Sequence, residues 1–146
     1  MTKLRCASFS DELNIIDVES TFTRGLPGFN IVGLASTSIK ESTERIRATL
    51  VSKNFSFPAQ KITINLSPSG IPKSGSHFDL AIAILIILQK ENLDDFFVFG
   101  ELGLDGLVKS TNELFSLLLF LSTKFKNAKI LIPKALAQKA AMIPNI

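Results

Sequence analysis

The N-terminal residues alternate between apolar and polar side chains, a pattern typical of β-strands. Residues 3–9 and 13–22 are rich in β-branched and aromatic side chains, and the polar residues 10–12 separate them. The turn-forming sequence RGLPG at 24–28 precedes a third short apolar run at 29–32. The pattern predicts three strands that open the fold as an antiparallel meander.

Helical periodicity begins near Ser38, which has the capping-box spacing to Glu41. One apolar stripe of this predicted helix consists of Ile39, Ile46 and Leu50. Residues 54–58 end the helix, and alternation at 61–66 predicts a further strand.

The most apolar predicted helix spans residues 78–89, and its side chains are apolar nearly all round. A helix lying on one sheet face would leave half of this surface in water. Because burying each Ile or Leu contributes about 1.5–3 kcal/mol before entropy, we expect a second cover. That cover is either the apolar helix predicted at 112–124, packed beside it across one sheet face, or another protein.

The remaining pattern completes an α+β order of βββ-α-β-α-ββ-α-β-α. It predicts, in order, a strand at 96–102, a tight turn at Asp105-Gly106, a strand at 107–108, a helix at 112–124, a strand at 128–132 and a helix at 134–142.

Composition limits the class of protein. The 146 residues fit one domain, and an apolar fraction of 46% suggests that some apolar surface is covered by a neighbour. The single cysteine, Cys6, and the single histidine, His77, exclude a disulfide framework and a Cys/His-rich metal site. The sequence has no signal peptide, and its apolar runs are shorter than the about 20 residues that span a bilayer. We therefore expect a cytoplasmic protein without metal or membrane partner, whose net charge of +3 permits nucleic-acid contact.

The segment SPSGIPKSGSHFDLAIAIL at 67–85 joins a predicted strand to the apolar helix, as a phosphate-binding loop does. Gly70 and Gly75 have the spacing of a Walker A loop, but Ser76 stands where that loop needs its lysine. Lys73 lies inside the loop and does not take that place. These residues argue against nucleotide binding and leave a weak anion site at the helix start as an alternative.

Ser74 and Ser76 are candidate nucleophiles. A serine at a helix N-terminus can attack a carbonyl after a lysine removes its proton. The helix predicted at 112–124 presents Leu and Phe inward and has its only lysine at the far end. A structural interpretation is simpler, because Ser76 and Asp79 have the spacing of a capping box and Asp79 meets the positive helix end.

Five collinear blocks together resemble the N-terminal region of the ComM/YifB proteins, bacterial AAA+ proteins of the magnesium-chelatase subunit I-like group. The blocks are GLPGFNIVGL at 25–34, KESTERIRATL at 40–50, FPAQKITINLSP at 57–68, PKSGSHFDLAIAI at 72–84 and GELGLDGLVK at 100–109. They cover essentially the whole chain.

The resemblance implies a fold and a context. The fold is the two-layer Lon-protease-domain type (ribosomal-protein-S-five domain-two-like), a mixed sheet with helices on one side, here a ChlI-type N-terminal domain over residues 1–146. The resemblance also implies a downstream AAA+ ATPase module that uses ATP and Mg and forms hexamers. This chain itself contains no Walker A or Walker B motif. Such proteins are linked to natural transformation and to helicase-like branch migration of DNA.

The chain departs from the family pattern at several positions. The usual Pro-Lys-Glu-Gly-Gly-Arg-Phe-Asp is PKSGSHFD here, so the permanently charged arginine of the pattern is replaced by His77, which can titrate. A second arginine, often found after the Lys-Glu start, is replaced by Thr43. Compared with Lon-type proteases, the place of the nucleophilic serine falls at about His77 and that of the lysine near Phe115. The resemblance therefore implies no catalytic residue in this chain.

We expect a non-catalytic domain, without a cofactor of its own, that supports oligomeric assembly of the ATPase and contacts DNA. The candidate contact residues are Arg24, Arg45, Arg47, Lys73 and His77. A further basic group consists of Lys124, Lys126, Lys129, Lys134 and Lys139. One alternative is a Ser-Lys peptidase of the Lon class that uses Ser74 or Ser76. Another is a module that binds a peptide or subunit along an exposed strand edge.

Overall fold

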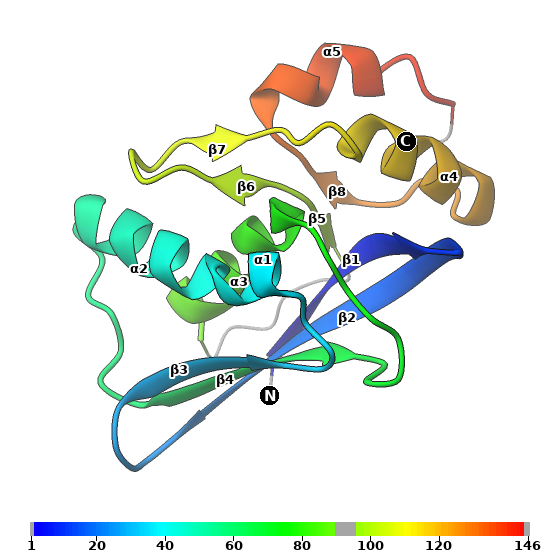
Figure 1. The fold of residues 1–146 in the computed structure, drawn as a ribbon. Helices are drawn as coiled ribbons and strands as arrows, with labels where there is room; N and C mark the ends of the chain where they lie inside the picture. Colours follow the sequence, from blue (N-terminus) through cyan, green and yellow to red (C-terminus); the bar gives the residue numbers. More distant parts are fainter. Residues whose placement is uncertain (1, 90–95, 145–146) are drawn as a thin grey trace.

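A computed structural model describes residues 2–89 and 96–144, which form an α+β fold with a twisted mixed sheet (Figure 1). The spatial order of the main sheet is β3 (Gly28–Val32), β4 (Lys61–Ser67), β2 (Glu12–Thr23), β1 (Thr2–Ser10), β5 (Phe97–Val98) and β8 (Ile130–Leu131). A separate hairpin is formed by β6 (Glu101–Leu102) and β7 (Val108–Lys109).

The helices between these strands are short. They are α1 (Thr37–Lys40), α2 (Ser42–Ser52), α3 (Asp79–Ile87), α4 (Leu114–Lys124) and α5 (Ala137–Ala140). Two 3₁₀ turns, η1 (Ser76–Phe78) and η2 (Lys134–Leu136), lead into α3 and α5.

The predicted N-terminal meander is only half correct. β1 and β2 form the expected antiparallel hairpin, with Thr2 opposite Ser20 and Ser10 opposite Glu12. The third strand does not follow them in space, because β4 lies between β2 and β3 and β3 runs parallel to β4. α1 and α2 form the crossover that a parallel pair requires, and alternation along one strand does not reveal its neighbour.

α3 lies at the centre of the core, as its apolar sequence requires. Ala81, Ile82 and Leu85 are fully buried. The helix contacts β1 and β2 on one side and α2 and β6 on others. The second cover is therefore α2 with the β6–β7 hairpin, not the helix predicted at 112–124.

α4 packs on the opposite face of the sheet, near the tip of the β1–β2 hairpin. Leu4 and Val18 are opposed in register and lie on the core face, whereas Phe9 and Leu13 are an odd number of residues away and face the other way. Phe9 contacts Phe120 of α4 edge to face, with ring centroids 5.3 Å apart. The prediction of helices on one side holds for α1–α3 and is wrong for α4.

Two local predictions also need correction. α1 is capped by Ser36, whose hydroxyl accepts from the Ile39 amide, and not by a Ser38–Glu41 capping box. The single strand predicted at 96–102 is divided into β5 and β6 at Gly100, whose backbone bonds to His77 and Leu80. A side chain there would meet Val108 at 2.8 Å, so the chain leaves the main sheet at a residue without one.

Candidate functional site

The segment between β4 and α3 is tied to the turn that leads into α1. Lys73 forms an isolated parallel bridge with Ala35, and its backbone N–H and C=O bond to Leu34 and Ser36. Further along, Gly75 has a φ of 105° and donates its amide proton to the Ser38 hydroxyl. A β-carbon at Gly75 would lie 2.6 Å from the His77 ring, so this turn requires glycine.

The Lys73 side chain is directed inward and is only 1% exposed. Its Nζ donates to the Gly33 carbonyl at 2.7 Å and to the Pro68 carbonyl. Burial lowers the pKa of this lysine. The ammonium thus connects two turns of the domain, and its position argues against the predicted contact with an external anion.

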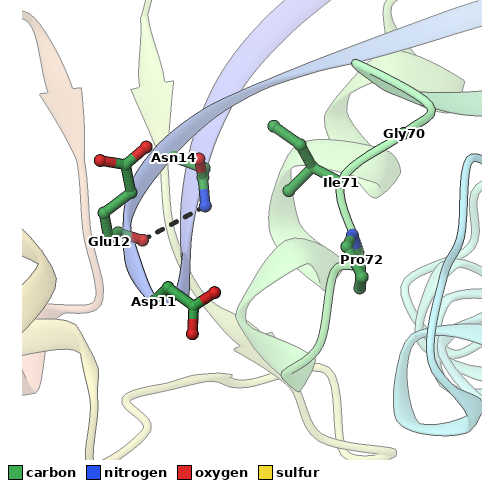
Figure 2. A pocket seen from close by; sticks show the side chains of 6 residues that line it. All are labelled: Asp11, Glu12, Asn14, Gly70, Ile71 and Pro72. Carbon is green, nitrogen blue, oxygen red and sulfur yellow. Dashed lines mark hydrogen bonds between the residues drawn. The ribbon is translucent and has the colours of Figure 1, made fainter.

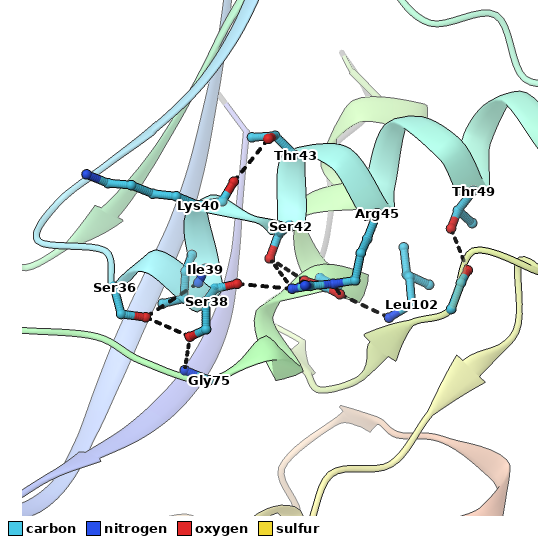
Figure 3. Close-up of polar contacts among 12 residues, drawn as sticks. Ser36, Ser38, Ile39, Lys40, Ser42, Thr43, Arg45, Thr49, Gly75 and Leu102 are labelled. Carbon is cyan, nitrogen blue, oxygen red and sulfur yellow. Dashed lines mark hydrogen bonds and ion pairs between the residues drawn. The ribbon is translucent and has the colours of Figure 1, made fainter.

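Arg45, labelled in Figure 3, forms an ion pair with Asp79. Arg45 donates from Nε to Asp79 Oδ2 at 2.7 Å and from Nη2 to Oδ1 at 3.1 Å. The Ser42 hydroxyl also donates to Oδ1, and the Leu102 amide donates to Oδ2 at 3.1 Å. The hydrogen bond to Asp79 is the main cause of a raised Arg45 pKa. This network joins α2, α3 and β6.

The predicted capping box at the start of α3 is not formed. The N-cap residues of η1 and α3 are Gly75 and Phe78, which make no side-chain cap hydrogen bond, and the Asp79 carboxylate accepts from Arg45, Ser42 and Leu102 instead. Asp79 does lie in the first turn of α3, where a negative charge is favourable.

His77 is also internal, with 3% of its surface exposed. Its Nε2 lies 2.8 Å from the Ala7 carbonyl, which can only accept, so Nε2 carries the proton. Nδ1 is buried and has no hydrogen-bond partner among the described residues. Burial lowers the pKa of His77, and the Ala7 bond and the charges of Glu113 and Asp79 oppose this shift.

The two serines considered as nucleophiles are not bonded to a lysine. Ser74 is exposed and Ser76 half-buried, while the neighbouring Lys73 Nζ is bound to two carbonyls. Phe115, near which the resemblance to Lon-type proteases places the catalytic lysine, is half-buried on α4. Across residues 2–89 and 96–144, no recorded hydrogen bond pairs Ser74 or Ser76 with a lysine, so the geometry gives the peptidase alternative no support.

The remaining predicted contact residues lie on the surface. Arg24 is exposed in the turn between β2 and β3. Arg47 is exposed on α2, with its guanidinium 4.3 Å from the centre of the Phe57 ring. The C-terminal lysines are exposed as well: Lys124, Lys126, Lys129, Lys134 and Lys139.

Two pockets involve residues that sequence analysis did not combine. The first, about 380 Å³, lies between the β1–β2 turn and the loop after β4 (Figure 2). Its lining is Asp11, Glu12, Asn14, Gly70, Ile71 and Pro72. The second, about 410 Å³, lies beside the turn between α4 and β8 and is lined by Arg5, Phe97, Phe125, Lys126, Asn127, Ala128 and Lys129. The Arg5 guanidinium lies 4.2 Å from the Phe97 ring centre. Sequence analysis did not include Arg5 among the candidate contact residues, because it is distant in sequence from Lys126 and Lys129.

Two further features are absent from residues 2–89 and 96–144. Those residues contain no group of three or more His, Cys, Asp or Glu side chains arranged to hold a metal ion. None of the helices described is both long and apolar enough to cross a bilayer.

The structure defines an α+β domain in which Arg45, Lys73 and Asp79 are bound within the domain. The chain belongs to the family described as subunit ChlI of Mg-chelatase, whose model matches residues 18–136. The resemblance to ComM/YifB proteins is thereby confirmed.

Individual relatives are longer than this chain. It is 32% identical to competence protein ComM of Haemophilus influenzae over 144 residues, which are 95% of the chain and 28% of ComM. It is 40% identical to the uncharacterized protein YifB of Escherichia coli over 99 residues, 64% of the chain and 20% of YifB. An uncharacterized protein of Mycobacterium tuberculosis is 40% identical over 100 residues, 65% of the chain and 20% of that protein. The chain therefore spans between a fifth and somewhat over a quarter of these relatives.

Proposed function

We propose that this chain is the non-catalytic N-terminal domain of a longer, ComM-like AAA+ ATPase and that it supports assembly of the ATPase subunits. The proposal rests on one observation: the charged groups beside α3 bind other parts of the same domain. Arg45 is bound to Asp79, and Lys73 to two backbone carbonyls. Groups held in this way fix the positions of α1, α2, α3 and β6 relative to one another and are not free to act on a substrate.

The relatives support the wider context. ComM is named a competence protein, and the chain covers 28% of its length. We infer that the ATPase module, with its ATP and Mg, lies in the rest of the longer protein and that the protein works in the cytoplasm as a hexamer in DNA uptake or recombination. The Lon-like fold type belongs to the same inference.

The experiment compares the longer protein with a form lacking residues 1–146. Sedimentation velocity in the presence of ATP measures assembly, and fluorescent-nucleotide binding measures the ATPase module separately. We expect the deletion to shift hexamers to smaller species while nucleotide binding persists. Hexamers that form equally well without the domain would contradict the proposal.

The peptidase alternative has its own control. Ser74→Ala combined with Ser76→Ala removes both candidate hydroxyls and leaves the Arg45–Asp79 network intact. We expect the variant to assemble as the unchanged protein does, and we expect neither protein to hydrolyse peptides. Hydrolysis that is present in the unchanged protein and disappears in this variant would replace the proposal.

A second function, contact with single-stranded DNA, is favoured by the pocket beside the α4–β8 turn. Arg5, Lys126 and Lys129 supply positive charge there, and the half-buried Phe125 supplies an aromatic surface. Cations that follow a phosphate backbone beside aromatic rings are the usual elements of single-strand binding. Arg45, Lys73 and His77 are weaker candidates, because they are bound within the domain or buried, whereas Lys126 of this pocket is exposed.

Salt dependence tests this contact. The logarithm of the binding constant should fall with the logarithm of salt concentration by about 0.7 for each phosphate neutralised. Lys126→Gln should reduce that slope by about 0.7, whereas Lys134→Gln, at an exposed lysine outside the pocket lining, should leave it unchanged. Equal effects of both variants in fluorescence anisotropy would assign the binding to overall charge.

A further inference from the structure

The outward face of α4 carries no charge. Its inward residues are buried: Leu114, Leu117, Leu118 and Leu121. Its outward residues recur at helical spacing i, i+3, i+4 and i+7, and they are Ser116, Leu119, Phe120 and Thr123. Leu119 is 42% and Phe120 53% exposed, and residues 114–123 include no charged side chain. A surface helix normally presents charged and polar residues on this side.

This outward stripe has the form of a helix-packing surface. Residues at i, i+3, i+4 and i+7 form the row through which one helix packs against another. Phe9 of β1, itself 41% exposed, packs on Phe120 and extends the apolar area beyond the helix. α4 lies on the outside of the molecule, where a partner can reach it (Figure 1).

We infer that this face binds the same face of a second copy of the chain, with the two α4 helices antiparallel. The stripe is symmetric in size, since the small Ser116 and Thr123 flank the large Leu119 and Phe120. In an antiparallel pair, Leu119 of one copy meets Phe120 of the other, and Ser116 meets Thr123. Such a self-complementary patch is what a two-fold interface requires.

The charges at the two ends of α4 favour the same arrangement. Glu113 precedes the helix and Lys124 ends it, and both are exposed. Eleven residues are close to three helical turns, so the two side chains lie on the same flank of the stripe. Antiparallel pairing brings each Glu113 to Lys124 of the partner subunit and opposes the two helix dipoles. Lys124 Nζ is 3.4 Å from the Leu13 carbonyl, a long contact that leaves other donor hydrogens available.

This interface is distinct from the proposed assembly function and does not depend on it. An isologous contact joins chains in pairs and does not by itself close a six-membered ring. The helix of 11 residues is only about 16 Å long, so a reversible dimer is expected and not a permanent one.

Sedimentation equilibrium of the 146-residue chain tests the inference. The chain should dimerise, and Leu119→Glu should weaken the dimer by about 30-fold or more, because it places charge at the centre of the interface. Leu104→Glu, at a leucine 66% exposed on the β6–β7 hairpin, is the matched control and should have no effect. A wild-type chain that stays monomeric, or equal weakening by both variants, would overturn the inference and leave this face to another occupant.

Charge reversal distinguishes an antiparallel pair of two copies from binding to a different partner. Glu113→Lys and Lys124→Glu should each dimerise several-fold more weakly, because each places like charges together at both ends of the interface. An equimolar mixture of the two variants should recover the association, since every contact in the mixed pair again joins opposite charges. Failure of the mixture to recover, with unchanged thermal melting of each variant by circular dichroism, would exclude the antiparallel pair.

Discussion

The Asp79 carboxylate accepts hydrogen bonds from three residues that are all distant from it in sequence: Ser42 and Arg45 of α2, and Leu102 of β6. The residue is fully buried, and an unpartnered carboxylate in such a place would be very costly. Its partners hold α2 and the start of β6 against α3. At the scale of single residues, therefore, the candidate site is a structural junction.

Replacing Asp79 with Asn keeps the shape and removes the charge. We expect a loss of about 3–5 kcal/mol in the free energy of unfolding, because Arg45 would keep a partly buried charge without its counter-ion. Urea denaturation measures the loss. The matched control is Asp17→Asn, which removes the exposed pair with Lys3 at 3.9 Å and should cost less than about 1 kcal/mol. Similar losses in both variants would contradict the structural role of Asp79.

His77 makes stability depend on pH in a defined direction. Its pKa is below the ordinary value of 6.5 because it is buried, so the unfolded chain binds the proton more readily. The stabilisation is present above pH 6.5 and is lost as the pH falls from there toward the lowered pKa. Because His77 is the only histidine in the chain, His77→Gln should flatten the urea-measured stability between pH 8 and about 5.5. A slope that persists in the variant would assign the effect to other groups.

The chemistry of these residues could be partly anticipated from the sequence. An aspartate at the start of an apolar helix indicates either a cap or a buried partner, and only the cap was predicted. Arg45 was predicted to contact nucleic acid or a partner on the surface. Its true partner is 34 residues away, and no periodic pattern links positions across two elements. Lys73 and His77 were likewise placed outside because residue type was the only guide to their exposure.

At the scale of elements, the contact between α2 and the β6–β7 hairpin rests on few polar groups. The Thr49 hydroxyl donates to the Gly103 carbonyl at 2.9 Å in a buried position. The side chain of Lys53, which follows α2, also lies over Gly106 of the hairpin turn. These contacts hold the hairpin, which forms no strand pairs with the main sheet among the described residues.

Thr49→Val tests this connection without changing side-chain size. We expect a cost of about 1–3 kcal/mol, because the Gly103 carbonyl would be left without its partner. Amide exchange within 101–109 should accelerate more than in β1 and β2. Ser52→Ala removes a hydroxyl that bonds only within α2 and should not affect the hairpin. If both variants alter hairpin exchange equally, the connection does not depend on Thr49.

Element types were easier to predict from the sequence than their neighbours. The β1–β2 hairpin, β4 and the cores of α2, α3 and α4 lie where periodicity placed them. The insertion of β4 between β2 and β3 was missed, as was the position of α4 on the opposite sheet face. Both depend on how long segments cross over the sheet, which alternation within one segment does not specify.

At the scale of the whole molecule, the main sheet is uneven in strength. β1 and β2 pair along nine consecutive residues and β2 continues into seven pairs with β4. At the other end, β5 and β8 contribute two residues each, and β8 is an edge strand. The core residues Cys6, Ile16, Val18 and Ile64 are fully buried, whereas Leu131 of β8 is 42% exposed. Backbone pairing is short in both β5 and β8, whereas apolar burial is complete in β5 and decreases only at β8.

This gradient predicts that the domain opens in stages. The amide of Leu131, which lies in the short β5–β8 pair, should exchange through a local opening with a free energy well below that of global unfolding, because few contacts need to break. Amides of β1, β2 and β4 should exchange only when the whole domain unfolds. Native-state hydrogen exchange at increasing low urea concentrations distinguishes the two, since local opening depends little on urea and global unfolding strongly. If β8 and β2 showed the same exchange free energy and the same urea dependence, the sheet would be one cooperative unit. The weak pairing of β8 would then be compensated by η2 and α5, whose buried Leu136 and Ala140 would be the next residues to truncate.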